Sequence, residues 1–208
     1  MPGVVQRDFP LFPLQIVALP GEVVPLHIFE DRYKAMMAHC LDSGSEFGIV
    51  WMAEDGLREI GCACAIERVL ERLADGRLNL LARGTRPFRV LERQAHLPYP
   101  AGVIEFVTDL DAEPNPGVAG AAHAAYAELV RRATDREPGD EDVDGMGAYE
   151  MAATVDFGPE AKQGLLDLRS EDARLRLVTR LFLAAAKRLD LVDRAQERAQ
   201  SNGKVHIG

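Results

Sequence analysis

Cysteine is scarce in this chain of 208 residues. Only Cys40, Cys62 and Cys64 are present, and so sparse and odd a set excludes the disulfide framework of a small secreted protein. Cys62 and Cys64 are two residues apart, which is too close for an ordinary disulfide and gives too few ligands for a zinc site. We interpret them as small apolar residues of a sheet, and we predict a cytoplasmic protein.

A surplus of positive charge is also missing, because 33 acidic residues outnumber 24 basic ones and give a net charge of -9. Nucleic-acid-binding proteins usually carry basic side chains that displace counterions from phosphates, so the charge argues against that partner. One local cluster of arginines is interpreted as a solvated strand edge, with a phosphate or acidic-peptide contact as the sharper alternative. Its members are Arg83, Arg86, Arg89 and Arg93.

The apolar run 9–26 does not predict a membrane span. Its four prolines prevent a continuous helix, and only Arg7 precedes it, which is unlike a signal peptide. Extended strands separated by a turn at Pro20-Gly21 explain the run better. We therefore predict no membrane partner.

Catalytic motifs are absent as well. A nucleophilic hydrolase needs a serine or cysteine with a base in reach, but the four serines lie at predicted helix ends or in turns. The five histidines lack metal-ligand spacing, and no HExxH, CxxC, P-loop or GxGxxG motif occurs. We predict that the protein is not an enzyme and has no cofactor.

One near-match to a calcium loop lies in the second half of the chain. Asp140, Asp142, Asp144 and Gly145 fit the start of an EF-hand loop, but Met151 stands where the loop needs a bidentate glutamate. We interpret the segment as an acidic connection, with a weak calcium site as the alternative, and predict no metal centre.

The first half of the chain predicts strands and one helix. Short apolar runs at 12–19 and 23–28 predict strands, and apolar residues spaced by three and four predict a helix over 30–41. Further strands are expected at 47–53, 58–73, 77–82, 88–93 and 103–107. Asp75-Gly76 predicts a tight hairpin turn. We expect a closed or strongly coiled sheet.

The second half predicts only helices, at 118–133, 147–155, 159–167 and from an N-cap at Ser170 to about residue 201. The last helix carries a seam of apolar residues spaced by threes and fours. A proline-rich stretch at 111–116 marks the boundary, which divides the chain into a β-domain (1–110) and a helical domain (117–203).

Several motifs resemble one known family. They are Phe9-Pro10-Leu11-Phe12-Pro13-Leu14, Leu19-Pro20-Gly21, the block PLHIFEDRY from Pro25 to Tyr33, Phe47-Gly48-Ile49-Val50, Gly61, Asp75-Gly76-Arg77 and the 84–90 stretch, with Lys162-Gln163 and Leu165-Leu166 further on. The chain resembles the substrate-binding N-terminal domain of Lon proteases, which also occurs as a free-standing protein.

The resemblance implies an α+β fold, in which a PUA-like six-stranded pseudo-barrel with one helix precedes an α-helical bundle with a long C-terminal helix. It implies recognition of unfolded or tagged polypeptides, with an ATP-dependent protease as a possible partner. The ATPase and Ser-Lys protease of full-length Lon have no counterpart in these residues. The alternatives are a PUA-like nucleic-acid-binding protein and a small-molecule enzyme with a deep pocket.

The family pattern usually carries an Arg-Phe pair after the glycine of the 84–90 stretch, where this chain reads Pro87-Phe88 flanked by Arg86 and Arg89. The candidate peptide-binding residues are Arg86, Phe88 and Arg89 of this stretch together with Trp51, the only tryptophan, which lies on the predicted 47–53 strand and has a place in the core as its alternative. Within the PLHIFEDRY block, we expect Phe29 and Tyr33 to anchor the first helix on the sheet.

Overall fold

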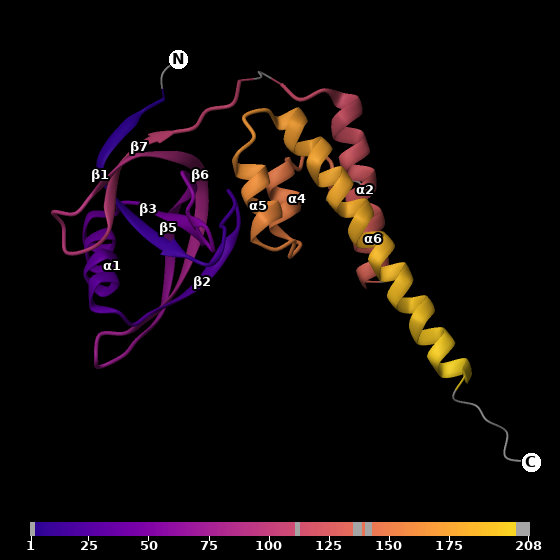
Figure 1. Ribbon diagram of the computed structural model, residues 1–208, viewed down its shortest axis with the longest axis horizontal. Coiled ribbons are helices and arrows are strands. Elements are labelled where there is room, and N and C mark those ends of the chain that lie inside the picture. Colours follow the sequence, from indigo (N-terminus) through magenta and orange to yellow (C-terminus); the bar gives the residue numbers. More distant parts are fainter. Residues whose placement is uncertain (1–2, 111–112, 135–138, 140–142, 203–208) are drawn as a thin grey trace, which may run out of the picture. The chain divides into compact units, whose positions relative to one another are not determined.

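A computed structural model (Figure 1) describes residues 3–110, 113–134, 139 and 143–202. Within these residues a mainly antiparallel sheet is combined with helices, which confirms the predicted α+β class. The strands are β1 (Val5–Leu14), β2 (Val23–Ile28), β3 (Phe47–Ala53), β4 (Gly56–Leu57), β5 (Ile60–Arg72), β6 (Leu78–Gln94) and β7 (Ala101–Phe106). The helices are α1 (Asp31–Ser43), α2 (Pro116–Thr134), α4 (Ala148–Ala153), α5 (Pro159–Leu166) and α6 (Glu171–Asn202).

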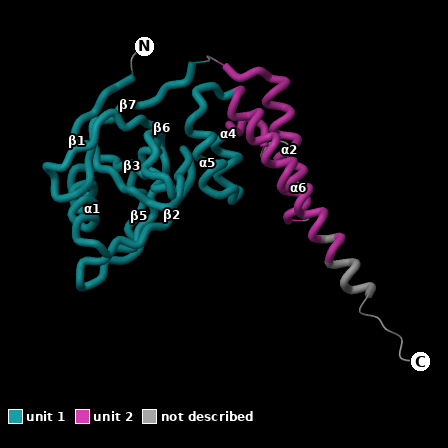
Figure 2. The backbone as a smooth tube through the Cα atoms, in the orientation of Figure 1, with its two compact units in different colours: residues 1–112, 149–171 teal, residues 113–148, 172–208 magenta. Residues whose placement is uncertain are grey.

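The chain separates into two compact units (Figure 2). Unit 1 combines residues 1–112 with 149–171, and unit 2 combines 113–148 with 172–208. The two domains predicted from sequence, 1–110 and 117–203, were meant as parts of the chain that fold independently. That independence stays a prediction. The grouping shows that the short helix α5 belongs with the sheet.

Five strands of the sheet pair in a closed circuit, here called the strand ring. β1 pairs with β7, β7 with β6, β6 with β5 and β5 with β3, all antiparallel, and β3 returns to pair with β1 in parallel. β2 adds to the first half of β6, and β4 forms a short hairpin with β3.

The two strands predicted at 77–82 and 88–93 are one continuous strand, β6. The prediction of two strands was wrong; the residues between them include Gly84 and Pro87, which are uncommon within a strand, yet Pro87 pairs with Cys62 of β5. The strand continues through Gly84, whose backbone N–H donates to the Glu22 carbonyl at 2.9 Å and whose carbonyl accepts from the Gly21 N–H at 2.8 Å. A side chain at Gly84 would collide with the Leu19 carbonyl, so the glycine permits this close approach.

The first strand was predicted at 12–19 but spans Val5–Leu14. Its exposed first half lacks an apolar signature, and it forms because Val5 and Gln6 pair with β7. Val17 and Leu19 are buried outside any strand, so their hydrophobicity reflected burial and not strand pairing.

The core of unit 1 lies among buried side chains of the strand ring. Phe9 packs edge-on against Phe88, with ring centroids 5.3 Å apart, and against Phe106 at 6.0 Å. The cluster consists of Phe9, Leu11, Val50, Ala63, Phe88, Ile104 and Phe106.

Helix α1 covers a neighbouring face of unit 1 with the stripe that the sequence predicted. Tyr33, Met36 and Met37 are buried, and the Tyr33 ring lies 4.4 Å from that of Phe12. Phe29 does not anchor the helix, because 58% of it is exposed; it lies before the helix, where its ring stacks on His27 at 5.8 Å.

In unit 2, α2 and α6 pack through Tyr126 and Phe182, whose rings are 5.3 Å apart. Arg132 forms an ion pair with Asp190. The predicted seam of α6 is buried at Leu175, Val178 and Phe182, whereas Val192 is exposed. None of the described helices has both the length and the apolar character to cross a membrane.

Candidate functional site

The candidate site lies at one end of the strand ring. β1 and β3 run parallel, so their last residues lie at the same end. The start of β7 joins them there, because Ala101 pairs with both Pro10 of β1 and Gln94 at the end of β6. Several loops and strand ends therefore meet around one opening.

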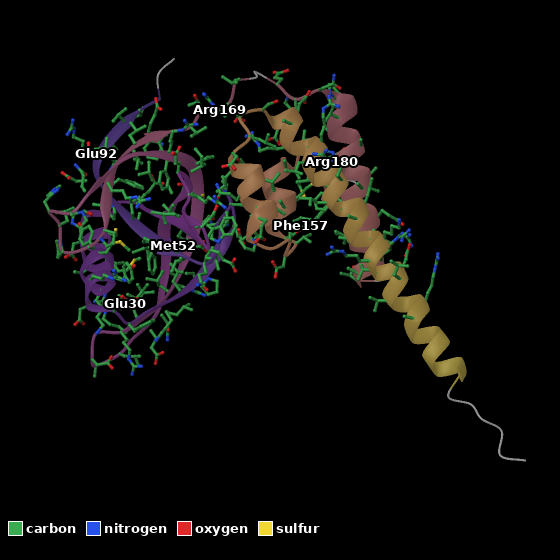
Figure 3. All side chains as sticks on the ribbon, viewed as in Figure 1. Glu30, Met52, Glu92, Phe157, Arg169 and Arg180 are labelled. Carbon is green, nitrogen blue, oxygen red and sulfur yellow. The ribbon has the colours of Figure 1, made fainter. Side chains whose placement is uncertain are left out.

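A groove of about 460 Å³ occupies this opening and is here called the mouth groove. Leu11 and Leu57 reach it from the core side, since Leu11 belongs to the buried cluster and Leu57 packs against it. Met52, which is labelled in Figure 3, comes from β3. It also lines the groove and is 42% exposed. A flexible, polarisable methionine on an apolar surface is well suited to contact side chains of varied shape.

The segment 94–101 forms one wall of the mouth groove. The backbone N–H of Asp8 donates to Gln94 Oε1 at 3.0 Å, and the Asp8 carboxylate lies 2.9 Å from His96 Nε2. At the other end of the segment, the Leu11 N–H donates to the Pro100 carbonyl at 2.8 Å. Asp8 has a φ of 56°, and the irregularity of β1 at this point aims it toward the segment.

Two arginines give the groove its charge, and its lining contains no aspartate or glutamate. Arg32 forms an ion pair with Glu30 at 2.8 Å, and its guanidinium lies 4.5 Å from the centre of the Tyr33 ring. Arg93 is exposed and forms no ion pair within the part of the chain that the structure describes. Burial raises the pKa of Tyr99, another lining residue, above its ordinary value, which favours the neutral phenol further.

One of the four peptide-binding residues predicted from sequence needs correction. Phe88 is 0% exposed and lies in the core cluster, so it has no surface to offer a peptide. The sequence could not show which face of β6 points inward.

The other three candidates are accessible but lie outside the lining of the mouth groove. Trp51 is half-buried, with the Arg58 guanidinium 5.2 Å from its ring centre. Arg86 forms an ion pair with Glu46 at 3.0 Å and lies 3.8 Å from the centre of the Phe106 ring. Arg89 is exposed. Their role in peptide binding stays a prediction.

Two of the four arginines of the β6 cluster are engaged in ion pairs, so the cluster is not a continuous free basic strip. Arg83 pairs with Glu67 at 2.8 Å and donates to the Gly21 carbonyl, and Arg86 is paired with Glu46. Phosphate contacts would have to compete with these carboxylates. The nucleic-acid alternative therefore gains no support from this surface.

Sequence reasoning missed Met52 as a site residue, although it noticed the adjacent Trp51. Consecutive residues of a strand point to opposite faces, and here it is Met52 that faces the groove. Arg32, Arg93 and Tyr99 were visible in the sequence, but only the closing of the strand ring brings them to one opening.

A second concavity, of about 630 Å³, is lined by residues of β2, β5 and β6. Three of its polar side chains are linked: His27 Nδ1 lies 2.6 Å from Asn79 Oδ1, and Asn79 Nδ2 donates to Glu71 Oε2 at 2.8 Å. Exposed Leu70 lies on its edge. Its side chains already satisfy one another, which makes it the weaker candidate for ligand binding.

No group of three His, Cys, Asp or Glu side chains among the described residues could hold a metal ion. In the predicted calcium alternative, Asp140 and Asp142 lie outside the described residues, and Asp144 is exposed.

The three cysteines are free and buried, and burial raises the pKa of the Cys62 thiol well above its usual range.

Fold and site together define an α+β protein whose strand ring opens onto an apolar groove. Comparison with known proteins agrees with this class. Residues 8–183 match the family model of the ATP-dependent protease La (LON) substrate-binding domain. The chain belongs to this family, as its motifs indicated.

Two solved structures share the fold. One is a Lon N-terminal domain protein from Xanthomonas campestris, with 27% identity and a TM-score of 0.63 over 81% of this chain and 95% of that one. The other is the N-terminal domain of Mycobacterium avium complex Lon protease, with 20% identity and the same TM-score over 85% of this chain and 98% of that one. The second shows likeness of fold alone.

Proposed function

We propose that this protein is a non-catalytic module that recognises unfolded or tagged polypeptides. Membership of the Lon substrate-binding family supports this proposal. The observation that carries it is the mouth groove, which presents the exposed, adaptable Met52 beside apolar residues that are continuous with the core. A mainly apolar concavity with a few polar groups is the usual form of a binding site.

The finer features of the fold form part of the same proposal. We interpret the strand ring with β2 as a PUA-like pseudo-barrel, and α2 with α6 as the centre of a helical bundle. The module acts in the cytoplasm without ATPase or protease chemistry of its own, and its partners are polypeptide clients and an ATP-dependent protease that degrades them. Neither a membrane nor a nucleic acid is required.

Binding in the mouth groove would place apolar client side chains on Met52 and Leu57. A folded client keeps such side chains in its own core, whereas an unfolded one exposes them. Selection for unfolded chains then follows from burial of apolar area, which contributes about 25 cal/mol per Å² removed from water.

The test is a titration of one client in its folded form and in a permanently unfolded form, for example after reduction and alkylation of its disulfides. We expect the unfolded form to bind and the folded form to bind at least tenfold more weakly, a difference of about 1.4 kcal/mol. Equal, negligible binding of both forms contradicts the proposal.

The groove is tested by Met52→Ser, which should weaken binding of the unfolded client about tenfold, the loss of one moderate apolar anchor. The matched control is Leu91→Ser. Leu91 is similarly exposed, at 51%, and lies on β6 outside the lining of the groove. Equal effects of the two substitutions would place the binding surface elsewhere, and Trp51, Arg86 and Arg89 would then be examined in the same way.

A further inference from the structure

The charge of the mouth groove is opposite in sign to that of the whole chain. The chain carries a net charge of -9, yet Arg32 and Arg93 are the only charged side chains that line the groove. A surface that departs from its surroundings in this way favours a ligand of complementary charge.

The two arginines differ in what they can still bind. Arg32 already has a carboxylate partner, Glu30, at 2.8 Å. Arg93 has no ion-pair partner within the described residues, so its planar guanidinium can take a carboxylate in a two-pronged hydrogen bond. Arg93 is therefore the stronger anion-binding group, whereas the charge of Arg32 is largely offset by that of Glu30.

The lining also indicates where the carboxylate of the ligand comes from. A C-terminal carboxylate is usually captured by several backbone N–H groups. Three lining residues, Pro13, Pro98 and Pro100, have no N–H, and the N–H of Leu11 is taken by the Pro100 carbonyl. Backbone N–H groups are left at Ala95, Leu97 and Tyr99, which alternate along the segment with residues outside this set. The charged donor without an ion pair among the described residues is the Arg93 guanidinium, and it suits an aspartate or glutamate side chain within a continuing peptide.

We propose that the mouth groove selects apolar peptide segments that carry an internal acidic side chain, with Met52 and Leu57 contacting the apolar residues and Arg93 binding the carboxylate. This inference rests on the proposed function and adds a preference among unfolded segments. Segments rich in lysine or arginine are disfavoured because their charge repels that of the groove.

The experiment uses the full chain and synthetic peptides of ten residues in isothermal titration calorimetry at low salt. The first peptide is acetylated and amidated, so that its only carboxylate is a central glutamate flanked by leucines. The second has the same end groups but a glutamine in place of the glutamate, and the third is acetylated, has the glutamine and keeps a free C-terminus as its only carboxylate. We expect the glutamate peptide to bind about tenfold more tightly than either of the others, an advantage that falls as salt is raised.

Two substitutions test whether the preference for the glutamate peptide arises in the mouth groove. Arg93→Gln should reduce the tenfold advantage to less than about threefold while the glutamine peptide binds as before. Arg72→Gln is the control, because Arg72 is an exposed β5 arginine outside the groove and its loss changes the net charge equally. An equal loss in both variants would reduce the effect to long-range attraction and overturn the role of Arg93.

Other results separate the two proposals. If the glutamate and glutamine peptides bind equally and Met52→Ser weakens both, the acidic preference is wrong and the polypeptide-binding function stands. If the free C-terminus alone gives tight binding, the source of the carboxylate is wrong. If no peptide binds but an unfolded client does, the groove is not the site, and if neither binds, both proposals fail.

Discussion

Gly61 leaves space in the strand ring for the ring of Phe88. A Cβ atom at this position would lie 2.6 Å from the Ile49 carbonyl oxygen and 2.8 Å from Phe88 Cζ. One of these neighbours is backbone and the other is a fully buried ring in the core, so neither can move without disturbing its surroundings. The glycine that marks the family in sequence thus has a packing role.

We predict that Gly61→Ala lowers the free energy of unfolding by about 2–3 kcal/mol, the range of an overpacked core. Chemical denaturation followed by tryptophan fluorescence measures this change. The control is Gly120→Ala on helix α2, where a Cβ meets nothing within 4 Å. There alanine should stabilise by up to about 1 kcal/mol, because it favours helix. Similar effects of the two substitutions would contradict the packing argument.

The buried Cys62 thiol leads to a prediction about the reactivity of the cysteines. Burial raises its pKa first, with the neighbouring Cys64 adding to the effect, and burial also raises the pKa of Cys40. A raised pKa means less of the reactive thiolate at a given pH. We expect iodoacetamide at pH 8 to modify none of the three cysteines in the native protein and all three in denaturant, as counted by mass spectrometry. Rapid labelling of the native protein would show that the core is open to reagent.

At the scale of elements, α5 is tied to the sheet by a pair of charges. Lys162 Nζ lies 2.5 Å from Glu22 Oε1, and their side chains are only 13% and 15% exposed. Glu22 Oε2 also accepts the Leu19 N–H at 3.0 Å, and the next residue, Gln163, donates to the Ile60 carbonyl at 3.2 Å. The Lys162-Gln163 motif therefore connects α5 both to the turn before β2 and to the start of β5.

We predict that Lys162→Met destabilises the protein by about 2 kcal/mol, because it leaves the half-buried Glu22 carboxylate without its charged partner. The double substitution Lys162→Met with Glu22→Gln should recover much of this loss, since no uncompensated charge remains. Lys187→Met, on an exposed part of α6, is the control and should change stability by less than about 0.5 kcal/mol. Equal losses in the single and double variants would mean that the charges themselves contribute little.

At the scale of the whole molecule, the chain returns to unit 1 after it has left it. Residues 149–171 group with 1–112, and they bring the buried side chains of Gln163, Leu165 and Leu166. The predicted domain boundary near residue 110 would separate this helical segment from the sheet with which it groups.

We therefore predict that a fragment of residues 1–110 unfolds at a lower temperature than the same fragment mixed with an excess of a peptide of residues 149–171. The peptide restores the partner of Glu22 and covers apolar surface, and a ligand that binds only the folded state raises its stability. Circular dichroism in the presence of the peptide, and of a scrambled peptide as control, measures the difference. Identical melting curves would support the boundary that the sequence suggested.

The sequence alone determined the elements whose signals are local. The 30–41 helix follows from its spaced apolar residues, and α1 ends at Ser43 because Gly44 follows it with a φ of 66°, a conformation that favours glycine. Asp75-Gly76 likewise set the β5–β6 hairpin, where Gly76 has a φ of 84°. The family motifs, which record many such local constraints together, identified the family.

Tertiary structure decided what depends on partners distant in sequence. The early start of β1 depends on β7, and the unbroken course of β6 through Gly84 depends on the approach of the 19–22 segment. The mouth groove has the same origin, because Arg32, Met52 and Arg93 meet only where the strand ring closes. Phe88 is buried and Met52 is exposed because of the face of its strand on which each one lies. Which face points inward is set by the pairing with neighbouring strands, and the composition of the strand does not determine it.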